Sequence, residues 1–267
     1  YPASSKGFKR RPLAWRLWAS GYHTWAVTGG GQIHPDYGFS AGFDEYQIAD
    51  WVRDVPTLLD QFAANSSHRQ FLFLHTYEIH DPYAHDEFAA GLPAGRIEGP
   101  FSFADYKKFK RRGAPTTDVE EEYVRALYDS GIAFVDRAFG QFVEGLEVGG
   151  FLKNTMIIVT SDHGEQLWEH SAFGHGQNMY DHQLLVPLIV YLPPELARSA
   201  GIRTRGGLVI DDQVRLVDIY PTVLDLLGIP WSAVHGRSLV PMLRGERMPE
   251  VDAFAEQTNT KPERKAL

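Results

Sequence analysis

Residues 155–165 read TMIIVTSDHGE, and this stretch decides the fold class. Its first six residues form an apolar run, which is typical of a strand that is buried on both faces. A polar cluster that includes Asp162 and His163 follows the run at once. Ligands of open α/β sheets bind beyond the carboxyl ends of the strands. The stretch therefore predicts both a strand and a functional site at its end.

Strands and helices alternate on both sides of this stretch. Further strands are predicted at 22–28, 71–75 (again buried on both faces) and 186–192. Helices are predicted at 12–19, 51–63 and 217–227. Apolar and small residues at intervals of three or four from Tyr123 to Leu146 predict a long helix with one buried stripe. Residues 81–117 are polar and irregular, so an exposed loop is predicted there. This alternation predicts an α/β sandwich with a largely parallel sheet.

Composition narrows the class of protein. The 267 residues include 26 Lys and Arg against 34 Asp and Glu, a net charge of −8, which argues against a nucleic-acid binder that works by bulk charge. The absence of cysteine excludes a disulfide scaffold and a thiolate site within these residues. The longest apolar run, Leu184–Leu192, is too short to span a membrane. We interpret the start at Tyr1 as that of a mature protein or a fragment, with periplasmic, secreted and cytoplasmic locations all open.

Asp162 and His163 are the first candidate site residues. Adjacent residues at a strand end can both turn toward one point, and a carboxylate with an imidazole suits a divalent cation that accepts nitrogen and oxygen ligands. In the alternative interpretation, Asp162 caps a following helix and His163 is incidental.

Two further histidines are candidates. His80 lies in HTYEIHDPY (75–83), after a predicted strand, and histidine suits acid catalysis at neutral pH. For His75, which still belongs to the strand, a structural role is favoured. His175 stands between Gly174 and Gly176, which allows a tight loop to present its ring to an anion. The basic run 107–112 is interpreted as a solvated loop.

The order of these motifs closely resembles the sulfatase family of the alkaline-phosphatase superfamily. Residues 161–165, 168–170, 173–176, 180–181 and 186–190 resemble the metal and anion region of that family. Residues 71–83 resemble its strand and active-site histidine, and 217–228 with 236–239 resemble a helix late in its main domain. The resemblance implies an alkaline-phosphatase-like three-layer sandwich with a mostly parallel central sheet. It would form one domain over 1–245, with 246–267 starting the connection to a truncated C-terminal subdomain.

The resemblance also implies a function, the metal-dependent hydrolysis of sulfuric esters by an activated nucleophile. Asp162 and His163 would be metal ligands, and Asp162 could also accept the proton of the nucleophile. His80 would contact the anion or protonate the leaving oxygen, and His175 stands where members keep a Lys or His on the sulfuryl or phosphoryl oxygens. The implied cofactor is one divalent cation, calcium by family usage, with manganese or zinc as alternatives because an imidazole suits them better. The implied partner is a small-molecule or glycan sulfate ester; the oligomeric state is left open.

Two departures from the family pattern stand out. The nucleophile motif Cys/Ser-x-Pro-x-Arg is absent, and Tyr1-Pro2 resembles the short sequence that follows it. We therefore expect the nucleophile to lie upstream of Tyr1 and this chain to be inactive by itself; Ser4 and Ser5 lack the motif. In addition, Gly29-Gly30-Gly31 stands where many members have Gly-Lys followed by a His, so an anion-binding lysine is missing.

Three functions remain in competition. The first is a sulfuric ester hydrolase. The second, which the missing lysine supports, is a phosphodiesterase, phosphonate monoester hydrolase or phosphoglycol transferase of the same superfamily. The third is a non-catalytic binding module. The presence of Asp162, His163, His80 and His175 together argues against the third, because a site that has lost catalysis has no reason to keep all four.

Overall fold

The computed structural model describes residues 11–111, 116–203, 206–232, 234–257 and 264–266, so the sequence features at Tyr1-Pro2, Ser4 and Ser5 lie outside the described residues. The chain divides into two compact units. The first unit comprises Tyr1–Phe103 and Thr117–Gly149, and the second comprises Ala104–Thr116 and Gly150–Leu267.

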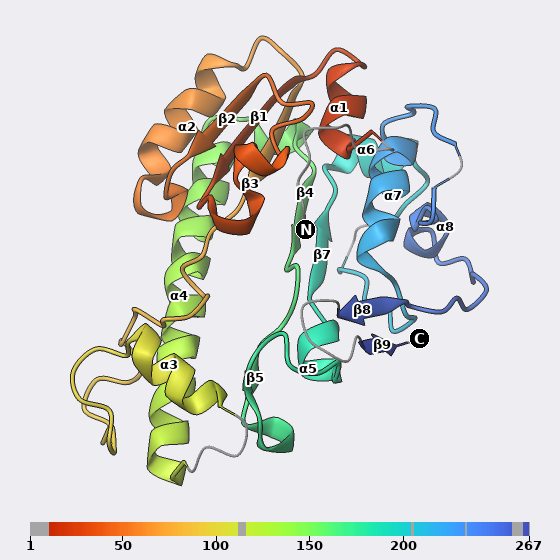
Figure 1. The fold of residues 1–267 in the computed structure, drawn as a ribbon. Helices are drawn as coiled ribbons and strands as arrows, with labels where there is room; N and C mark the ends of the chain where they lie inside the picture. Colours follow the sequence, from red (N-terminus) through yellow and green to blue (C-terminus); the bar gives the residue numbers. More distant parts are fainter. Residues whose placement is uncertain (1–10, 112–115, 204–205, 233, 258–263, 267) are drawn as a thin grey trace. The chain divides into compact units, whose positions relative to one another are not determined.

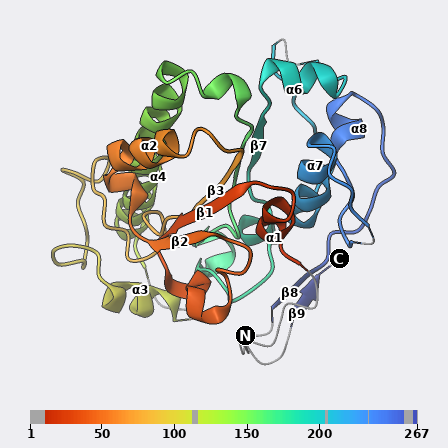
Figure 2. The same cartoon turned by 90° about the horizontal axis from the view of Figure 1, so that it is seen from above.

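The first unit contains a parallel sheet and its helices (Figure 1). Its elements are α1 (Leu13–Trp18), β1 (His23–Thr28), η1 (Gly31–Ile33), η2 (Pro35–Tyr37), β2 (Glu45–Ile48), η3 (Trp51–Arg53), α2 (Val55–Ala64), β3 (Gln70–Leu74) and α4 (Asp118–Val148). The strand order is β2-β1-β3 and both pairings are parallel, with Trp25 opposite Glu45 on one side and Leu72 on the other (Figure 2). The predicted parallel α/β architecture is confirmed in this unit.

The exposure of β3 differs from its prediction. The middle strand β1 is buried from Thr24 to Thr28, but the residues of β3 are half-buried, and Phe73 is 39% exposed. The prediction that β3 is buried on both faces is therefore wrong. In the described part of this sheet β3 pairs with β1 alone, so it is an edge strand with less cover than the middle strand.

Helix α4 supports the sheet through α2. Its predicted stripe is largely buried, and Phe142 on it packs edge-on against Phe62 of α2, with ring centroids 6.3 Å apart. Gly145 allows this approach, because a Cβ there would overlap the side chain of Leu59. The predicted helix over 51–63 is interrupted at Asp54, whose carboxylate accepts a hydrogen bond from Thr57 N and so begins α2.

The start of α4 is fixed by a buried carboxylate. Thr117 and Glu120 form a capping box, and the Glu120 side chain, which is fully buried, also accepts hydrogen bonds from Arg96 Nε at 2.7 Å and Nη2 at 2.6 Å. The Arg96 side chain, aided by the backbone N–H groups of Arg96 and Thr117, lowers the pKa of Glu120 to about 2. Glu120 thereby fastens the segment around Arg96 to the helix.

The second unit contains shorter elements (Figure 1). They are α3 (Phe103–Lys110, whose first residue ends the first segment of the first unit), η4 (Leu152–Asn154), β4 (Ile157–Thr160), β5 (Gln166–Leu167), η5 (Glu169–Ser171), β6 (Phe173–Gly174), α5 (Asp181–Leu184), β7 (Leu188–Tyr191), α6 (Pro194–Ser199), η6 (Leu216–Asp218), α7 (Ile219–Leu226), α8 (Val240–Leu243), β8 (Ala255–Gln257) and β9 (Arg264–Ala266). Strands β4 and β7 pair antiparallel, with Ile157 opposite Tyr191. Both were predicted, but β4 is half-buried rather than buried on both faces, and its last residue Thr160 is exposed.

Helix α3 lies within the predicted loop 81–117 and corrects that prediction. Tyr106 and Phe109 are both 3% exposed; the Tyr106 ring lies 5.5 Å from Phe173, and the Phe109 ring 5.6 Å from Trp168. The basic run at 107–112 is therefore not a solvated loop. Its first residues form the last turn of α3, where lysines favour the negative helix end, and Arg112 lies outside the described residues.

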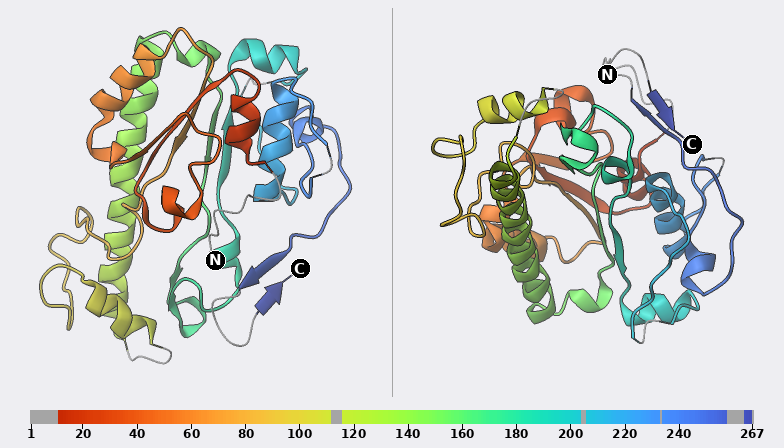
Figure 3. Two further views of the ribbon diagram at one scale, coloured as in Figure 1. Left: turned by 45° about the horizontal axis from the view of Figure 1, so that its top comes forward. Right: turned by 90° about the horizontal axis from the view of Figure 1, so that it is seen from below.

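The remaining core of the second unit joins α6, α7 and α8. Leu192, Ala197, Ile202, Leu226 and Val240 form one buried cluster. Strands β8 and β9 pair antiparallel near the C-terminus (Figure 3). Among the described residues, no helix is both long and apolar enough to cross a membrane.

Candidate functional site

The loop after β4 holds the first two candidates. Ser161 Oγ donates to the backbone oxygen of His163 at 2.6 Å, and His163 N donates to Asp162 Oδ1 at 3.0 Å. Gly164 N donates to Gln183 O at 3.0 Å, and a Cβ at Gly164 would overlap His182 O. Only glycine allows the chain to pass there, so His163 is held immediately before a close backbone contact.

The orientation of His163 suits metal binding. Its Nδ1 lies 2.9 Å from Gly164 O, an acceptor, so Nδ1 carries the proton and Nε2 the lone pair. Nε2 lies 3.8 Å from Asp162 Oδ2, a separation that one cation at about 2.0–2.4 Å from each atom can bridge. The side chains are 39% and 79% exposed, so both are accessible. Asp162 caps no helix, because β5 is the next regular element.

His175 lies beside His163 in the same unit. Their ring centroids are 4.4 Å apart, and Glu165 accepts from His175 Nδ1 at 3.1 Å. The Glu165 side chain is only 7% exposed, so it is a buried partner that fixes the ring. Gly174 before it has a φ of 83°, and a Cβ there would lie 2.6 Å from Tyr106 Oη of α3. Sequence reasoning missed the role of Glu165, because a pairing across ten residues of irregular chain has no periodic signal.

Neutral amides fasten this loop. Gln166 Oε1 accepts from Asn178 Nδ2 at 2.6 Å, Asn178 Oδ1 accepts from Gln183 Nε2 at 2.9 Å, and Gln183 Oε1 accepts from Gly176 N at 2.8 Å. Gln166 is fully buried and Gln183 is 7% exposed. The chain of amides connects both ends of the loop and fixes the backbone directly after His175.

The loop after β3, in the first unit, holds His80. His80 N donates to Tyr77 O at 2.9 Å. The rings of His80 and Tyr77 meet edge to face, with centroids 5.4 Å apart. Tyr77 Oη accepts from Gln32 N at 3.0 Å. A Cβ at Gly29 would lie 2.8 Å from the Tyr77 ring, and one at Gly31 would overlap Tyr77 Oη. The glycine turn noted in the sequence therefore makes room for Tyr77.

His80 also has an oriented ring. Its Nδ1 lies 2.8 Å from Asp81 O and 3.1 Å from Asp81 Oδ1. Sequence reasoning passed over Asp81, although its place next to His80 was a usable signal.

A charged cluster anchors the same loop to the rest of the first unit. Glu78 accepts from Arg53 Nη2 at 2.9 Å and lies 2.5 Å from His85 Nε2, while Arg53 also pairs with Asp50 at 2.7 Å. Burial acts to raise the pKa of Glu78, but hydrogen bonds from Asp50, His85 and Arg53 outweigh it and lower that pKa. Burial and the neighbouring Glu78 raise the pKa of Asp50. The His85 ring stacks on Phe134 of α4, with centroids 4.1 Å apart.

The four predicted residues thus fall into two groups. Asp162, His163 and His175 lie together in the second unit, whereas His80 lies in the first. The predicted convergence of all four stays a prediction.

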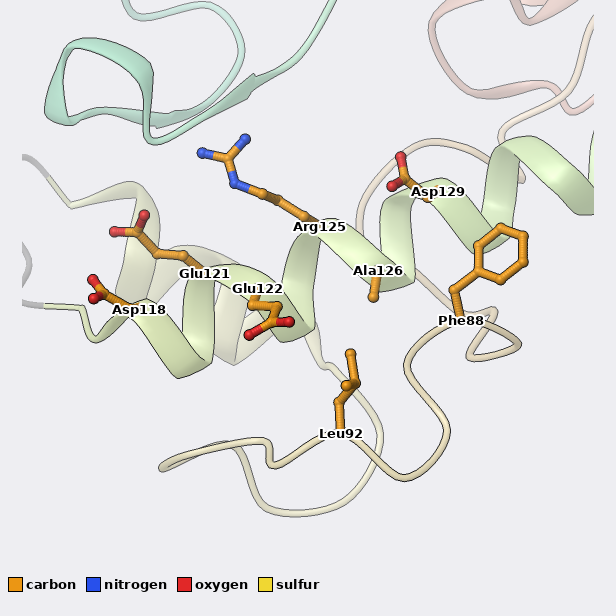
Figure 4. Close-up of a pocket in the computed structure, with 8 residues that line it drawn as sticks. All are labelled: Phe88, Leu92, Asp118, Glu121, Glu122, Arg125, Ala126 and Asp129. Carbon is orange, nitrogen blue, oxygen red and sulfur yellow. The ribbon is translucent and has the colours of Figure 1, made fainter.

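A shallow groove of about 500 Å³ along α4 is a poor candidate for an anion site (Figure 4). Its floor is apolar and its rim is acidic, with a single guanidinium from Arg125. The lining residues are Phe88, Leu92, Asp118, Glu121, Glu122, Arg125, Ala126 and Asp129. A rim with this charge repels an anionic ester.

Comparison with known proteins decides the family. The family model described as Sulfatase matches residues 20–229. The chain belongs to the sulfatase family. Members of this family are metal-dependent.

Curated relatives of this sulfatase include arylsulfatase K from several vertebrates. This chain is 35% identical to the Danio rerio protein over 48% of its own residues, and it is 37% identical to the Homo sapiens protein over 47% of its own residues. The Gallus gallus protein is 38% identical over 51% of this chain. The matches span 23%, 22% and 24% of those relatives, so this chain aligns with about a quarter of their length.

Solved structures similar to this sulfatase show its fold. A phosphonate monoester hydrolase from Silicibacter pomeroyi has a TM-score of 0.65 at 22% identity, over 94% of this chain and 65% of that one. The phosphonate monoester hydrolase of Agrobacterium radiobacter has a TM-score of 0.65 at 19% identity, over 95% of this chain and 66% of that one. A protein in complex with its substrate D-glucosamine-2-N,6-O-disulfate has a TM-score of 0.63 at 18% identity, over 97% of this chain and 70% of that one. The α/β, alkaline-phosphatase-like fold predicted from the sequence is confirmed.

The donor set of this sulfatase fits part of a metal site. Asp162 and His163 offer one carboxylate oxygen and one oriented imidazole nitrogen, both accessible. Two ligands are fewer than the four to eight or so that zinc or calcium takes in proteins. A complete metal site would need further ligands beside these two.

Proposed function

We propose that this chain supplies part of the active site of a metal-dependent sulfuric ester hydrolase. One observation carries the proposal: His80, His163 and His175 each have Nδ1 next to an oxygen acceptor, so each neutral ring has its lone pair on Nε2. Incidental histidines have no reason to share one tautomer. Uniform Nε2 groups beside an accessible carboxylate suit the binding of a cation and a charged ester.

Asp162 and His163 are proposed as metal ligands, through Oδ2 and Nε2. The bound cation would offset negative charge on the ester and lower the pKa of the nucleophile. Calcium is proposed from family usage, and manganese and zinc are the alternatives because an imidazole ligand suits them better.

His80 and His175 are proposed to act on the substrate. As the oxygen of the nucleophile bonds to sulfur, the S–O bond to the leaving group breaks and its electron pair passes to the leaving oxygen. Protonated His80 donates its Nε2 proton to that oxygen. His175, with Glu165 behind its Nδ1, directs Nε2 to the remaining oxygens of the ester. The nucleophile is proposed to lie upstream of Tyr1, so this chain by itself would bind without turnover.

The proposed substrate is a sulfate ester of a small molecule or a glycan. The name of the vertebrate relatives, arylsulfatase K, supports the ester class. The disulfated glucosamine bound by a structural neighbour supports the glycan option.

A phosphonate or phosphodiester substrate is the second candidate. Two observations favour it: the glycine turn 29–31 carries no lysine, and two structural neighbours are phosphonate monoester hydrolases. The nucleophile would still lie upstream, and the roles of the histidines would be unchanged.

The test compares this chain, an N-terminally extended protein and its His163→Ala variant. Each is assayed on an aryl sulfate, a phosphodiester and a phosphonate monoester with calcium, manganese or zinc. Turnover of the sulfate by the extended protein alone, lost in H163A, supports the first candidate. Faster turnover of a phosphorus ester supports the second. Turnover by this chain itself refutes the upstream nucleophile, and inactivity of the extended protein on every substrate refutes an enzymatic role.

A further inference from the structure

Asp81 is a buried carboxylate with a defined contact. Its side chain is only 3% exposed, although Pro82 and Ala84 beside it are exposed. Its Oδ1 lies 3.1 Å from Nδ1 of His80, whose side chain is 33% exposed. A buried carboxylate needs a hydrogen-bond donor to offset its lost hydration. The His80 ring provides that donor.

The contact determines which ring nitrogen of His80 carries a proton. Nδ1 faces two acceptors, the Asp81 carboxylate at 3.1 Å and the Asp81 carbonyl at 2.8 Å. Neither can donate, so neutral His80 has its proton on Nδ1 and its lone pair on Nε2. A histidine without such contacts is not restricted to one tautomer in this way.

The ring is also held on a second side. Tyr77 meets it at an interplanar angle of 83°, and Tyr77 itself is fixed by Gln32 N and by the glycine turn. The aromatic contact limits where the ring lies, but an edge-to-face contact does not distinguish Nδ1 from Nε2. The polar contacts with Asp81 at Nδ1 do make that distinction.

We propose that Asp81 is a positioning residue that holds His80 as the Nδ1–H tautomer with Nε2 directed to the reacting ester. This inference rests on the proposed function, since it assigns the support for the proton donor named there. Asp81 does not touch the substrate in this scheme and exchanges no proton. It determines which nitrogen receives a proton from water and passes it to the leaving oxygen.

The first test reads the tautomer directly and needs no activity. The 267-residue chain is labelled with ¹⁵N at histidine, and long-range ¹H–¹⁵N spectra are recorded above the usual histidine titration range, with His80→Gln to assign the signal. We expect a protonated Nδ1 and an unprotonated Nε2 on His80. Asp81→Leu removes the carboxylate but leaves the Asp81 carbonyl, so it should increase the Nε2–H fraction in part. Asp86→Asn, a change at an exposed carboxylate of the same segment, should leave that fraction unaltered. An Nε2–H tautomer in the native chain, or no change in D81L, overturns the proposal.

The second test uses leaving groups in the N-terminally extended protein. A poor leaving group needs its proton, whereas a nitrophenolate leaves without one. Asp81→Asn should therefore lower kcat about 100-fold or more for an alkyl sulfate, but by less than about 10-fold for a nitrophenyl sulfate. Equal losses would indicate a structural role and overturn the proposal. Inactivity of the native extended protein would refute the proposed function but leave the tautomer result standing, so the two failures are distinguishable.

Discussion

The loops after β3 and β4 both present histidines, but they are fastened by different chemistry. The loop after β3 depends on charge: Glu78 with Arg53 and His85, Asp81 with His80, and Glu120 with Arg96 a little further along the chain. The loop after β4 depends mainly on the neutral amides of Gln166, Asn178 and Gln183. Two carboxylates add to them: Glu165 accepts from His175 Nδ1, and Glu169 accepts from Leu167 N. Charged partners respond to pH and salt, whereas amides do not. The two loops should therefore fail under different conditions.

The largest effect is expected where the loop after β4 offers its ligand. His163→Ala removes an oriented Nε2, and the loss of metal catalysis, several kcal/mol, corresponds to about a 1,000-fold fall in kcat/KM of the extended protein. Metal content after dialysis should fall with it. His235→Ala, at an exposed histidine of the same unit, is the control and should retain both. Full metal content in H163A would remove His163 from the ligand set.

The next effect tests the charged anchoring of the first unit. Glu120→Gln removes the charge of a buried carboxylate that pairs with the half-exposed Arg96, and it should lower the free energy of unfolding by about 2 kcal/mol at pH 7, measured in urea. The pKa of Glu120 is lowered from 4.5 to about 2, so its stabilisation is complete above pH 4.5 and is lost as the pH falls toward 2. The difference between native and variant should shrink over that interval. The neighbouring exposed Glu122→Gln should change little, and a pH-independent loss in E120Q would contradict the ionic explanation.

The corresponding change in the loop after β4 should be independent of pH. Gln183→Ala leaves Gly176 N without its acceptor, removes one of the donors to Asn178 Oδ1 and should cost about 1–2 kcal/mol. Because no group in the amide chain titrates, the cost should be the same at pH 7 and pH 4. Gln213→Ala, which removes one exposed hydrogen bond, serves as the control. A cost that varies with pH would break the contrast between the loops.

The smallest effect is expected at Glu78. Arg53 is 56% exposed, so Glu78→Gln should cost only about 1 kcal/mol at pH 7. Because the pKa of Glu78 is lowered, the stabilisation by its carboxylate is fully present above the ordinary pKa range of a glutamate. It is lost as the pH falls from that range through the lowered pKa. The pKa of Asp50 is raised, so Asp50 has the opposite effect on the pH dependence of stability and offsets part of the effect of Glu78. Glu87→Gln, in the exposed pair with Arg137, should be neutral. Denaturation midpoints of the native protein and of the Glu78→Gln and Glu87→Gln variants, measured at two pH values, check the order of these effects.

Periodic features were predictable from the sequence, and irregular ones were not. The stripe on α4 repeats over many turns and the strands are continuous apolar runs, so both were found. Helix α3 was missed because four of its eight residues are charged and its apolar signal is short, with Phe103, Tyr106 and Phe109 at intervals of three. The burial of β3 was overestimated because a run of apolar residues does not reveal whether a strand has one neighbour or two.

The candidate site divides in the same way. Asp162 with His163 was found because the two are adjacent at a strand end. Glu165 with His175, and the amide chain from Gln166 to Gln183, were missed because loop geometry alone brings those residues together. Function-bearing residue types were therefore visible in the sequence, whereas the partners that orient them were not.

The interlock of Tyr77 with the glycine turn has an evolutionary consequence. Gly30 has φ 72° and ψ −122°, a conformation that essentially only glycine adopts, and Gly31 leaves no space for a Cβ beside Tyr77. A lysine introduced at position 30 would strain this turn, and relaxing the turn would displace the aromatic ring. Positions 30, 31 and 77 are thus epistatic. A scan of single substitutions should score each as intolerant, whereas a lineage that acquires the lysine has to change the tyrosine with it.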